Sequence, residues 1–429
     1  MTVKIGLVGT GTVGGGCIDI INAHKDDFKH RLGIDIELVR VCSLSKEEAD
    51  AHGVGDLFTS DFHDIINDPE INLVIELIGG TGVAHTIVTE ALKAGKYVVT
   101  ANKALMATAG EEIFRLVEEA GVEIGFEASV GGGIPIIDPL KHNLISNEIS
   151  SVLGIVNGTT NYMLTRMDED GMAYADVLAE AQAKGFAEAD PTADVDGFDA
   201  AAKIAILASI AFNSRVVLAD VHTEGIRNVQ PIDLKTARDM GYVVKLLAIA
   251  HRLPEGIDVR VHPTRIPEEH QMAHVNGVYN AIYVTGDAVG ETMFFGEGAG
   301  AGPAASAVMG DVLDISRHIM LGAPPIVGCT CADAIPIVSI DQLQTRYYIR
   351  LVVPDRTGVL AAAADVFARH DVSLRSVSQE GTRARDAVNL IFVTHTACEK
   401  NIREALAELA AMEDMLVSEP TLIRVEDND

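Results

Sequence analysis

Apolar runs of strand length alternate with longer, helix-like stretches through the N-terminal third of the chain. These runs cover residues 3–8, 34–42, 72–78, 97–100 and 122–126. Strands that alternate with helices build an open parallel sheet, and such sheets bind ligands beyond the carboxyl ends of their strands. The pattern therefore predicts an α/β fold in which the residues that follow each strand face a common cleft.

A glycine-rich motif follows the first apolar run. Gly9-Thr10-Gly11-Thr12-Val13-Gly14 lies between that strand and a helix-like stretch from Gly15 to about His24. In a dinucleotide fold, Gly9 permits the tight turn, Gly11 lets the backbone approach a pyrophosphate and Gly14 lets helix and strand pack closely. The N-terminus of the helix then offers N–H groups to the phosphates. The motif predicts NAD or NADP binding, and the alternative is a glycine-rich turn without a ligand.

The end of the second apolar run bears on the choice between these cofactors. NAD-specific sites usually place an acidic residue there, which binds the 2′-hydroxyl of the ribose. This chain has Cys42-Ser43-Leu44-Ser45-Lys46 instead. Without the acid a 2′-phosphate is not repelled, and Lys46 could pair with it, so these residues lean towards NADP. The alternative is that Lys46 is an ordinary surface lysine.

Composition narrows the classes of function. The 429 residues include 33 Lys and Arg against 62 Asp and Glu, which gives a net charge of −29, with no Trp and 5% aromatic residues. Such a chain is poor in basic surface and in base-stacking side chains, which disfavours nucleic acid and anionic membranes as partners. Its five scattered cysteines indicate reduced thiols, and neither a signal peptide nor an apolar run of membrane length is found. We expect a soluble, cytoplasmic protein of about three domains.

Residues with reactive side chains lie at a strand end and in the middle of the chain. Lys103 follows the apolar run 97–100, and a carboxylate-dense segment, Gly185–Asp199, leads into an apolar helix that contains Lys203. Asp199 and Lys203 are four positions apart, so they share one face of the helix. One interpretation is a general acid or base lysine held by carboxylates beside a substrate ammonium group. The other is a structural Asp–Lys pair beneath a solvated acidic loop.

Several motifs occur in order along essentially the whole chain. They are Gly9–Gly14, Val99–Leu105, Glu127–Pro135, Asn157–Tyr162, Gly185–Lys203, and Gly298–Gly300 with Ala305–Val308. Together they closely resemble homoserine dehydrogenase, in its longer bacterial form with a C-terminal ACT domain. One departure is Cys42-Ser43, where relatives often have Arg-Asp or Arg-Asn.

The resemblance implies a fold of three parts. A Rossmann-type NAD(P)-binding domain would cover residues 1–134 and be completed by about 300–322. A central α+β domain, residues 135–299, would bind the substrate and form the dimer interface. A linker would cover 323–345 and an ACT regulatory domain 346–429. The protein would assemble as a homodimer or homotetramer.

The resemblance also implies the reaction, in which L-aspartate 4-semialdehyde is reversibly reduced to L-homoserine with NADP or NAD, a step of threonine, methionine and isoleucine biosynthesis. Lys203 would donate or accept the proton, with Lys103 as a second lysine at the reacting oxygen. The substrate would be held by Glu188, Asp199, Asp194, Gly158 and Thr159. Besides the glycine-rich motif, the cofactor would contact Ser43, Lys46, Thr100, Lys103, Gly185 and Gly300. A lysine acting as base must first lose a proton, so we expect homoserine oxidation to be faster in alkaline solution.

A structural sodium ion is a further implication of the resemblance. The matching residues are Glu127 and the backbones of Val130, Gly132 and Ile134. A hard monovalent cation suits this motif, because carbonyl groups on a glycine-rich turn can converge on it while one carboxylate supplies charge.

The C-terminal part of the chain follows a different pattern. Its segments alternate as strand, helix, strand, strand, helix and strand over residues 347–353, 359–370, 372–379, 387–396, 400–412 and 421–425. This order predicts a ferredoxin-like fold, preceded by a linker that Pro324-Pro325 opens, and the acidic residues 426–429 are expected to be solvated. The turn 354–358 resembles that of ACT domains, which implies L-threonine as an inhibitory effector at Asp355, Gly358, Val359 and Leu360. The alternative is a purely oligomerising module.

Three other functions compete with this interpretation. A hydroxyacid dehydrogenase with an ACT domain would use a His/Glu/Arg site, and no such constellation accompanies the glycine-rich motif. A dehydrogenase that forms an acyl-enzyme needs a cysteine near a base, and the cysteines at 17, 42, 329 and 331 fall in the nucleotide fold or the linker. A sensor without activity would be expected to lose the reactive cluster, yet Lys103, Glu188, Asp199 and Lys203 are all present.

Overall fold

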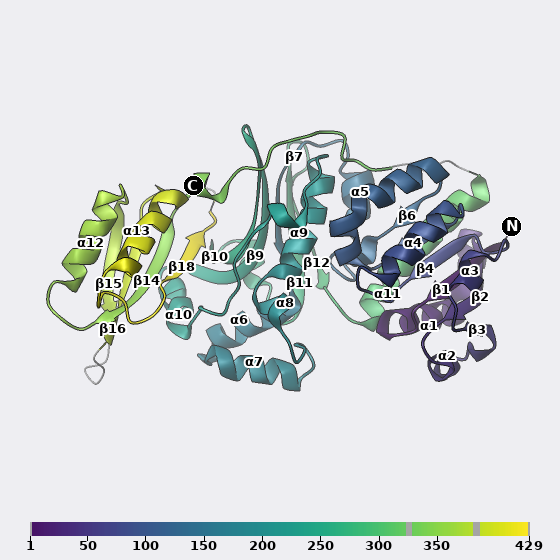
Figure 1. Ribbon diagram of the computed structural model, residues 1–429, viewed down its shortest axis with the longest axis horizontal. Coiled ribbons are helices and arrows are strands. Elements are labelled where there is room, and N and C mark those ends of the chain that lie inside the picture. The colour runs from purple at the N-terminus through teal and green to yellow at the C-terminus, as the bar shows by residue number, and fades with distance from the viewer. Residues whose placement is uncertain (1, 323–327, 381–386, 428–429) are drawn as a thin grey trace. The chain divides into compact units, whose positions relative to one another are not determined.

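The computed structural model describes residues 2–322, 328–380 and 387–427 (Figure 1). The chain folds into two compact units. The first comprises Met1–Val156, Ala202–Asp220 and Tyr279–Ile335, and the second comprises Asn157–Ala201, Val221–Val278 and Pro336–Asp429.

A six-stranded parallel sheet forms the centre of the first unit. Its strands are ordered β3-β2-β1-β4-β5-β6. They span β1 (Thr2–Val8), β2 (Asp35–Cys42), β3 (Phe58–Thr59), β4 (Leu73–Glu76), β5 (Tyr97–Thr100) and β6 (Ile124–Gly125). The order runs in opposite directions on the two sides of β1, so a crevice for a ligand opens at the carboxyl end of β1. This confirms the parallel α/β fold predicted from the apolar runs.

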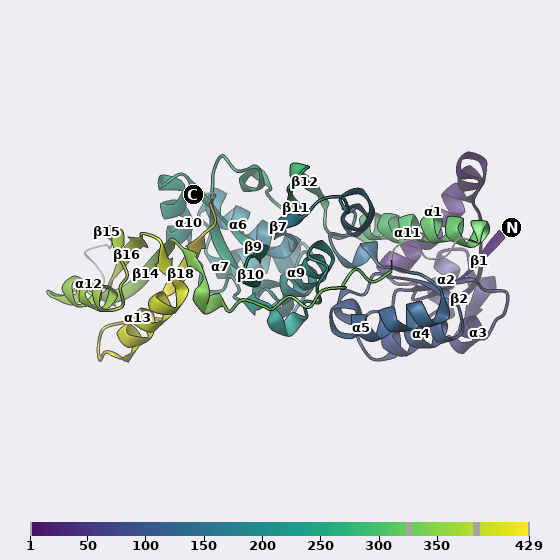
Figure 2. The same ribbon diagram turned by 90° about the horizontal axis from the view of Figure 1, so that it is seen from above.

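Helices cover both faces of this sheet. In the view of Figure 2, α1 (Thr12–Asp27) and α11 (Ala301–Leu321) lie along one face, and α4 (Val83–Lys93) and α5 (Lys103–Ala120) along the other. The strands present apolar side chains to the helices because they are buried on both faces. Val308 and Val312 of α11 are fully buried in the same core as the residues of β1. Short helices α2 (Lys46–Ala51) and α3 (His63–Ile66) complete this region.

The first unit also contains an antiparallel ladder of three strands. β11 (Tyr279–Gly286) pairs with both β7 (Ile149–Ile155) and β12 (Gly290–Glu297). Helix α9 (Phe198–Ala211) begins in the second unit and ends in the first.

The second unit begins with helices and a long hairpin. Its helices are α6 (Gly158–Asp170), α7 (Tyr174–Ala183), α8 (Thr192–Val195) and α10 (Pro231–Asp239). Strands β9 (Tyr242–Leu253) and β10 (Gly256–Pro267) form an antiparallel hairpin, and the short strand β8 (His222–Thr223) lies parallel to β10.

The predicted ferredoxin-like module completes the second unit. Its elements are β14 (Tyr347–Pro354), α12 (Val359–Arg369), β15 (Leu374–Glu380), β16 (Ala387–Thr394), α13 (Glu399–Ala411) and β18 (Thr421–Val425), with sheet order β18-β14-β16-β15. A further short pair joins β13 (Gln344–Thr345) to β17 (Ala397–Cys398). Both helices pack on one face of the sheet around a core that includes Phe367 and Phe392. The βαββαβ order predicted from the sequence is therefore confirmed.

The ferredoxin-like module and the β9–β10 hairpin share one sheet within the second unit. β18 runs parallel to β10, with Thr264 opposite Arg424. Glu426 bonds to His251 and Arg260, and Asp427 pairs with Arg346, so the expectation that this acidic end is merely solvated is wrong for both residues. The tertiary fold brings these carboxylates next to basic side chains, and the ion pairs that result cannot be predicted from the local sequence. Pro324-Pro325 lies outside the described residues.

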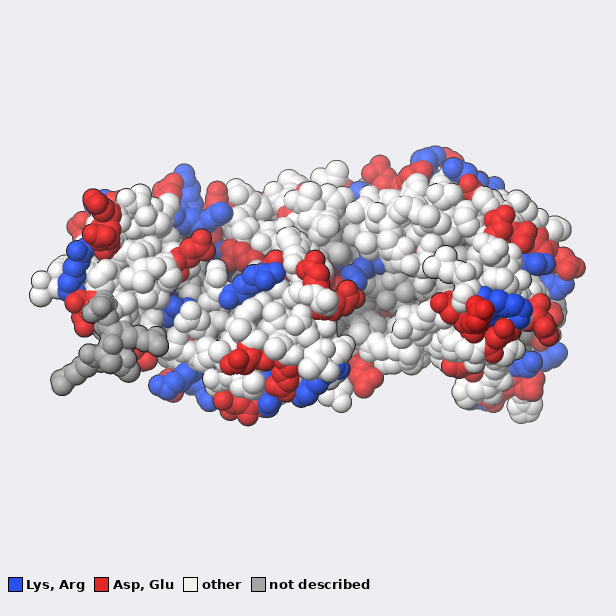
Figure 3. All heavy atoms as spheres, turned by 60° about the horizontal axis from the view of Figure 1, so that its bottom comes forward, with Lys and Arg blue, Asp and Glu red and all other residues white. Residues whose placement is uncertain are grey.

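On the face shown in Figure 3, acidic and basic side chains alternate in small groups, and the basic groups do not join into a continuous patch. Among the helices of the described ranges, none has both the length and the apolar character that a membrane span requires.

Candidate active site

The glycine-rich turn has the shape that the sequence predicted for it. Gly9 has a φ of +101°, which L side chains rarely adopt. A Cβ on Gly14 would lie 1.8 Å from the carbonyl oxygen of Gly9, so helix α1 can pack this closely only without a side chain there. Gly11 is the N-cap of α1, and a Cβ on it would meet no atom within 4 Å. The turn thus leaves open space at the N-terminus of α1, where a phosphate would be stabilised by N–H groups.

Charged residues beside this turn are already paired. The hydroxyl of Thr10 donates to the carboxylate of Glu48 (2.6 Å), and Lys46 pairs with Asp50 one helical turn further along α2 (2.6 Å). The hydroxyl of Ser43 donates to the carbonyl of Ser45 (2.6 Å). Glu48 was not predicted from the sequence, because it follows the end of β2 by six positions and belongs to the next helix.

A buried carboxylate organises the ends of β4 and β5. Glu76 is fully buried and accepts hydrogen bonds from the hydroxyl of Thr100 (2.7 Å) and the N–H of Ile78 (2.9 Å). Asn102 caps α5 by accepting from the N–H of Leu105 (3.1 Å). Lys103 is therefore the first residue of α5, fixed at the carboxyl end of the parallel sheet where the sequence predicted it.

One asparagine joins two of the predicted substrate-binding carboxylates. The side-chain N–H groups of Asn157 donate to Asp194 (2.7 Å) and to Asp199 (2.9 Å). Its side-chain oxygen caps α6 by accepting from the N–H and the hydroxyl of Thr160, both at 2.9 Å. Asn157 was quoted within a motif but not predicted as a site residue. Its position directly before a helix gave only a capping signal.

Lys203 is buried although its side chain is ionisable. Its ammonium nitrogen donates to the carbonyl of Val156 at 2.6 Å. Lys203 follows Asp199 by one turn of α9, and Asp199 is buried as well. Val156 directly precedes Asn157, so the lysine and the two carboxylates are held by adjoining residues at the end of β7.

The other predicted substrate and cofactor residues lie around α6 and α7. The hydroxyl of Thr159 donates to the carbonyl of Phe186 (2.6 Å), and a Cβ on Gly158 would meet the carbonyl oxygen of Val278 at 2.7 Å. Gly185 has a φ of +74°, and Glu188 is exposed. In the first unit, Gly300 is the N-cap of α11 with a φ of +119°.

The predicted sodium-binding turn is tightly closed. Gly131 and Gly132 have φ values of +76° and +57°, and the N–H of Ile134 donates to the carbonyl of Gly131 (2.9 Å). The carboxylate of Glu127 accepts from three consecutive backbone N–H groups, those of residues 136–138, at 2.6 to 2.8 Å. These three backbone donors fix the position of the Glu127 carboxylate beside the turn.

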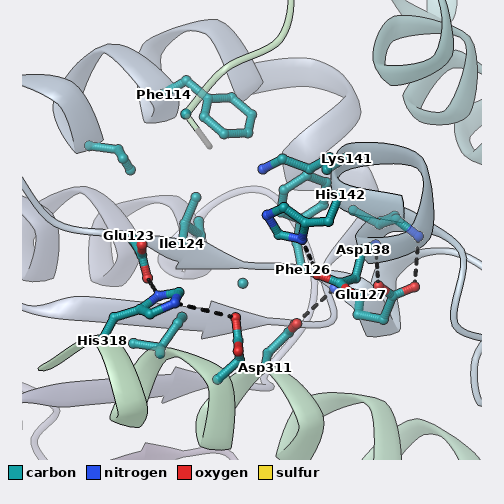
Figure 4. Close-up of a pocket in the computed structure, with 16 residues that line it drawn as sticks. Phe114, Glu123, Ile124, Phe126, Glu127, Asp138, Lys141, His142, Asp311 and His318 are labelled. Carbon is teal, nitrogen blue, oxygen red and sulfur yellow. Dashed lines mark hydrogen bonds and ion pairs between the residues drawn. The ribbon is translucent and has the colours of Figure 1, made fainter. Parts of the chain in front are cut away.

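A small, partly open pocket of about 70 Å³ adjoins this turn (Figure 4). Asp311 accepts from the N–H of Glu127 (2.9 Å), and His318 bonds to Glu123 (2.8 Å). Burial raises the pKa of Asp311 well above its ordinary value, and burial also raises the pKa of Glu127 despite its hydrogen bonds. Within the described ranges, no group of three or more His, Cys, Asp or Glu residues is arranged to hold a metal ion.

The predicted effector turn connects β14 to α12. Gly358 is the N-cap of α12 with a φ of +92°, and Val359 is buried beneath it. Asp355 and Leu360 are exposed. The four predicted effector residues therefore lie together on one surface turn.

A parallel sheet with an open glycine-rich turn, followed by a buried lysine beside carboxylates, defines the class of nicotinamide-dependent oxidoreductases, here with a ferredoxin-like module at the C-terminal end. Family models agree with this class. The model "Homoserine dehydrogenase, NAD binding domain" matches residues 9–127, "Homoserine dehydrogenase" matches 135–313 and "ACT domain" matches 347–414.

Relatives of known name cover the chain from end to end. Homoserine dehydrogenases from Synechocystis sp. and Neisseria gonorrhoeae are 44% and 41% identical over 99% of this chain and 100% and 98% of their own lengths. The crystal structure of a homoserine dehydrogenase from Thiobacillus denitrificans matches with a TM-score of 0.92 at 41% identity, covering 100% of this chain and 99% of that one. The chain belongs to the homoserine dehydrogenase family.

Proposed function

We propose that this enzyme interconverts L-homoserine and L-aspartate 4-semialdehyde with Lys203 as the proton-transferring residue, in the biosynthesis of threonine, methionine and isoleucine. The observation that carries the proposal is the junction at Val156–Asn157, where a buried lysine and two carboxylates are held by adjoining residues. A substrate ammonium group needs carboxylates, and a reacting hydroxyl needs an acid or base within hydrogen-bonding reach. A carboxylate and a lysine one turn apart on α9, Asp199 and Lys203, support both parts of the proposal.

The proposed roles follow from charge. Asp194, Asp199 and the exposed Glu188 bind the substrate ammonium group, while Gly158 and Thr159 line its pocket. Lys203 protonates the oxygen of the aldehyde as it becomes an alkoxide, and Lys103 stabilises the same oxygen. In the reverse direction a neutral Lys203 accepts the hydroxyl proton. The nicotinamide, when bound, supplies or takes up the hydride.

Replacement of Lys203 tests this assignment. We expect Lys203→Ala to lower kcat for homoserine oxidation by about 10²–10⁴-fold, the usual contribution of general acid–base catalysis, and to leave NADPH and NADH binding intact. Turnover would be followed by nicotinamide absorbance and cofactor binding by fluorescence. The matched control is Lys235→Ala, on the exposed face of α10. A Lys203→Ala variant with kcat near that of the wild type would exclude the role.

The glycine-rich turn, together with Ser43, Lys46, Thr100, Gly185 and Gly300, is proposed to bind NADP or NAD. The open space at Gly11 supports this role, because a pyrophosphate must approach the backbone there. A structural sodium ion is proposed at Glu127 and the carbonyl groups of Val130, Gly132 and Ile134, and the two glycines with positive φ support a turn of this kind. A hard cation binds oxygen ligands of this type. Thermal unfolding in NaCl against choline chloride tests the ion.

L-Threonine is proposed to inhibit the enzyme by binding at Asp355, Gly358, Val359 and Leu360. The exposed carboxylate of Asp355 would meet the effector ammonium, and the N-terminus of α12 would meet its carboxylate. Threonine titration of the wild type and of Asp355→Ala tests this, because we expect the variant to lose inhibition while its kcat is unchanged.

We further propose that the protein is a cytoplasmic homodimer or homotetramer. Light scattering would measure the mass of the assembly.

A further inference from the structure

A short segment of the second unit lies between the ACT domain and the helix that carries Asp194. We call residues 224–229, which connect β8 to α10, the junction segment. The N–H of Glu224 donates to the carbonyl of Val261 (2.8 Å), so the segment starts from a fixed point on β10.

Two arginines of the ACT domain hold one side of the junction segment. Arg424, on β18, donates two hydrogen bonds to the carboxylate of Glu224, at 2.7 and 2.8 Å, and two more to the fully buried Glu399 at the start of α13. Arg350, on β14, donates to the carbonyl of Asn228 (3.3 Å). The segment is thus bonded directly to two strands of the ACT domain, β14 and β18, and through Arg424 it is linked to α13.

The other side of the junction segment contacts helix α8, which carries Asp194. The N–H of Ile226 donates to the carbonyl of Val195 (2.8 Å), and Arg227 pairs with Asp196. A Cβ on Gly225 would lie 2.1 Å from the carbonyl oxygen of Val195, so the two backbones are in direct contact. A displacement of the segment therefore acts on Val195 and Asp196, the two residues that directly follow Asp194.

The contact between the junction segment and the ACT domain is an ion pair of Glu224 with Arg424. Burial alone would raise the pKa of Glu224, but hydrogen bonds from His222 and Arg424 outweigh it and hold the pKa well below its usual range. Arg424 is 1% exposed and has two carboxylate partners on different elements. A shift of α13 or β18 would leave part of a buried charge unpaired, which is costly, so Glu224 is expected to follow Arg424.

We propose that the junction segment positions Asp194 for substrate binding and transmits to it the state of the ACT domain. This rests on the proposed role of Asp194 in binding the substrate ammonium group. Glu224 acts through the 195–196 backbone and is a positioning residue. A cavity of about 490 Å³, lined by the segment and by residues 419–422 of the ACT domain, leaves room for such a movement.

Substitution of Glu224 tests the proposal in the full-length enzyme. We expect Glu224→Gln to raise KM for homoserine by about three- to tenfold. This is the usual size of the effect when a substitution weakens the coupling between two sites of a protein. KM for the cofactor and kcat should stay near their wild-type values, and Glu224→Asp should recover part of the loss. If the wild type responds to L-threonine, the concentration that gives half inhibition should also rise in Glu224→Gln.

Glu426→Gln is the matched control. Glu426 is likewise bonded to an arginine where β10 meets β18, but it bonds to Arg260 and His251 and none of its hydrogen bonds within the described ranges involves the junction segment. A general weakening of the ACT domain contact would lower the unfolding temperature of both variants, whereas the homoserine KM should change only in Glu224→Gln. Equal changes of KM in both variants, or an unchanged KM in a folded Glu224→Gln, would overturn the proposal.

Arg227→Gln provides an independent arm, since Arg227 is exposed and its loss should not impair folding. We expect it to raise KM for homoserine by about two- to threefold by releasing Asp196. An unchanged KM here would contradict the contact with α8. If Asp194→Asn itself leaves KM for homoserine unchanged, the proposed substrate role fails, and the positioning proposal, which depends on it, is overturned with it.

Discussion

The glycine-rich turn and the carboxylates proposed to bind the substrate are held in different ways. The shape of the turn depends on the backbone, because Gly9 and Gly14 allow strand and helix to approach closely and Gly11 leaves space for a ligand. The positions of the proposed substrate carboxylates depend on a side chain, because the amide of Asn157 bonds to Asp194, Asp199 and the start of α6. A site made of backbone is sensitive to any added atom, whereas a site made of side chains is sensitive to any lost donor.

Among the tests of this comparison, the largest effect is expected at Asn157, whose side-chain amide bonds to several partners. Asn157→Ala removes two hydrogen bonds to carboxylates and a helix cap, and hydrogen bonds to charged groups are worth about 1.5–3 kcal/mol each. We therefore expect kcat/KM for homoserine to fall by about a hundredfold. Steady-state kinetics beside the control Asn22→Ala, which alters an exposed amide on α1, would measure this. A fall of less than threefold would mean that Asp194 and Asp199 hold their positions without it.

The opposite change, an added atom, tests the nucleotide turn. In Gly14→Ala the new Cβ meets the carbonyl oxygen of Gly9, and overpacking of this kind costs about 1–3 kcal/mol. We expect cofactor affinity to fall at least about tenfold as the turn shifts. Gly310→Ala is the control, because it lies within α11 and its Cβ would meet nothing within 4 Å. Equal cofactor affinity in Gly14→Ala and the wild type would show that the turn does not bind the pyrophosphate.

A third prediction concerns pH and the contact between β10 and the ACT domain. Burial alone would raise the pKa of Glu426, but Arg260 and His251 lower it from 4.5 to about 2. Its folded pKa is below its unfolded pKa, so the stabilisation is complete above about pH 4.5 and is lost as the pH falls towards 2. Glu426→Gln should cost about 1–3 kcal/mol at neutral pH and flatten the dependence of the unfolding free energy on pH in that window. Urea unfolding from pH 2 to 7 measures both, and parallel curves for variant and wild type would contradict the assignment.

The smallest effect is expected at the end of β2, where the ribose of the cofactor is proposed to bind. Lys46 is paired with Asp50, and Glu48 brings a negative charge to Thr10 of the glycine-rich motif, an arrangement that disfavours a 2′-phosphate. Removing the carboxylate in Glu48→Gln should raise the ratio of kcat/KM for NADP to that for NAD by about two- to fivefold, the range of an exposed charge pair. Glu47→Gln, on the same helix, should leave the ratio unchanged. An unchanged ratio in both variants would place the ribose away from Glu48.

The elements of the parallel sheet and of the ACT domain could be predicted because their apolar residues follow clear strand and helix patterns. The runs 97–100 and 421–425 match β5 and β18 residue for residue, and the run 3–8 differs from β1 by one residue. Each of these strands buries apolar side chains in a core, so its sequence reflects its surroundings directly.

Polar pairs that form only in the folded chain could not be predicted in this way. Arg350 and Arg424 lie in strands with an apolar pattern, and their partners Asp233 and Glu399 come from distant helices. Glu426 was expected in solvent for the same reason. Nothing in the local sequence of an arginine says which carboxylate the tertiary fold will bring to it, and the bridging role of Asn157 was hidden behind an ordinary capping signal.

The parallel pairing of β10 with β18 has a consequence for synthesis of the chain. β10 leaves the ribosome long before β18. β8 pairs with β10 at Arg260 and Val261, but until β18 arrives the part of the same edge at Thr264 and Arg265 stays uncovered. Uncovered edges of this kind invite pairing with other nascent chains. The ACT domain therefore acts as a folding partner for the β9–β10 hairpin, and variants that delay the formation of β18 should lower the yield of folded enzyme.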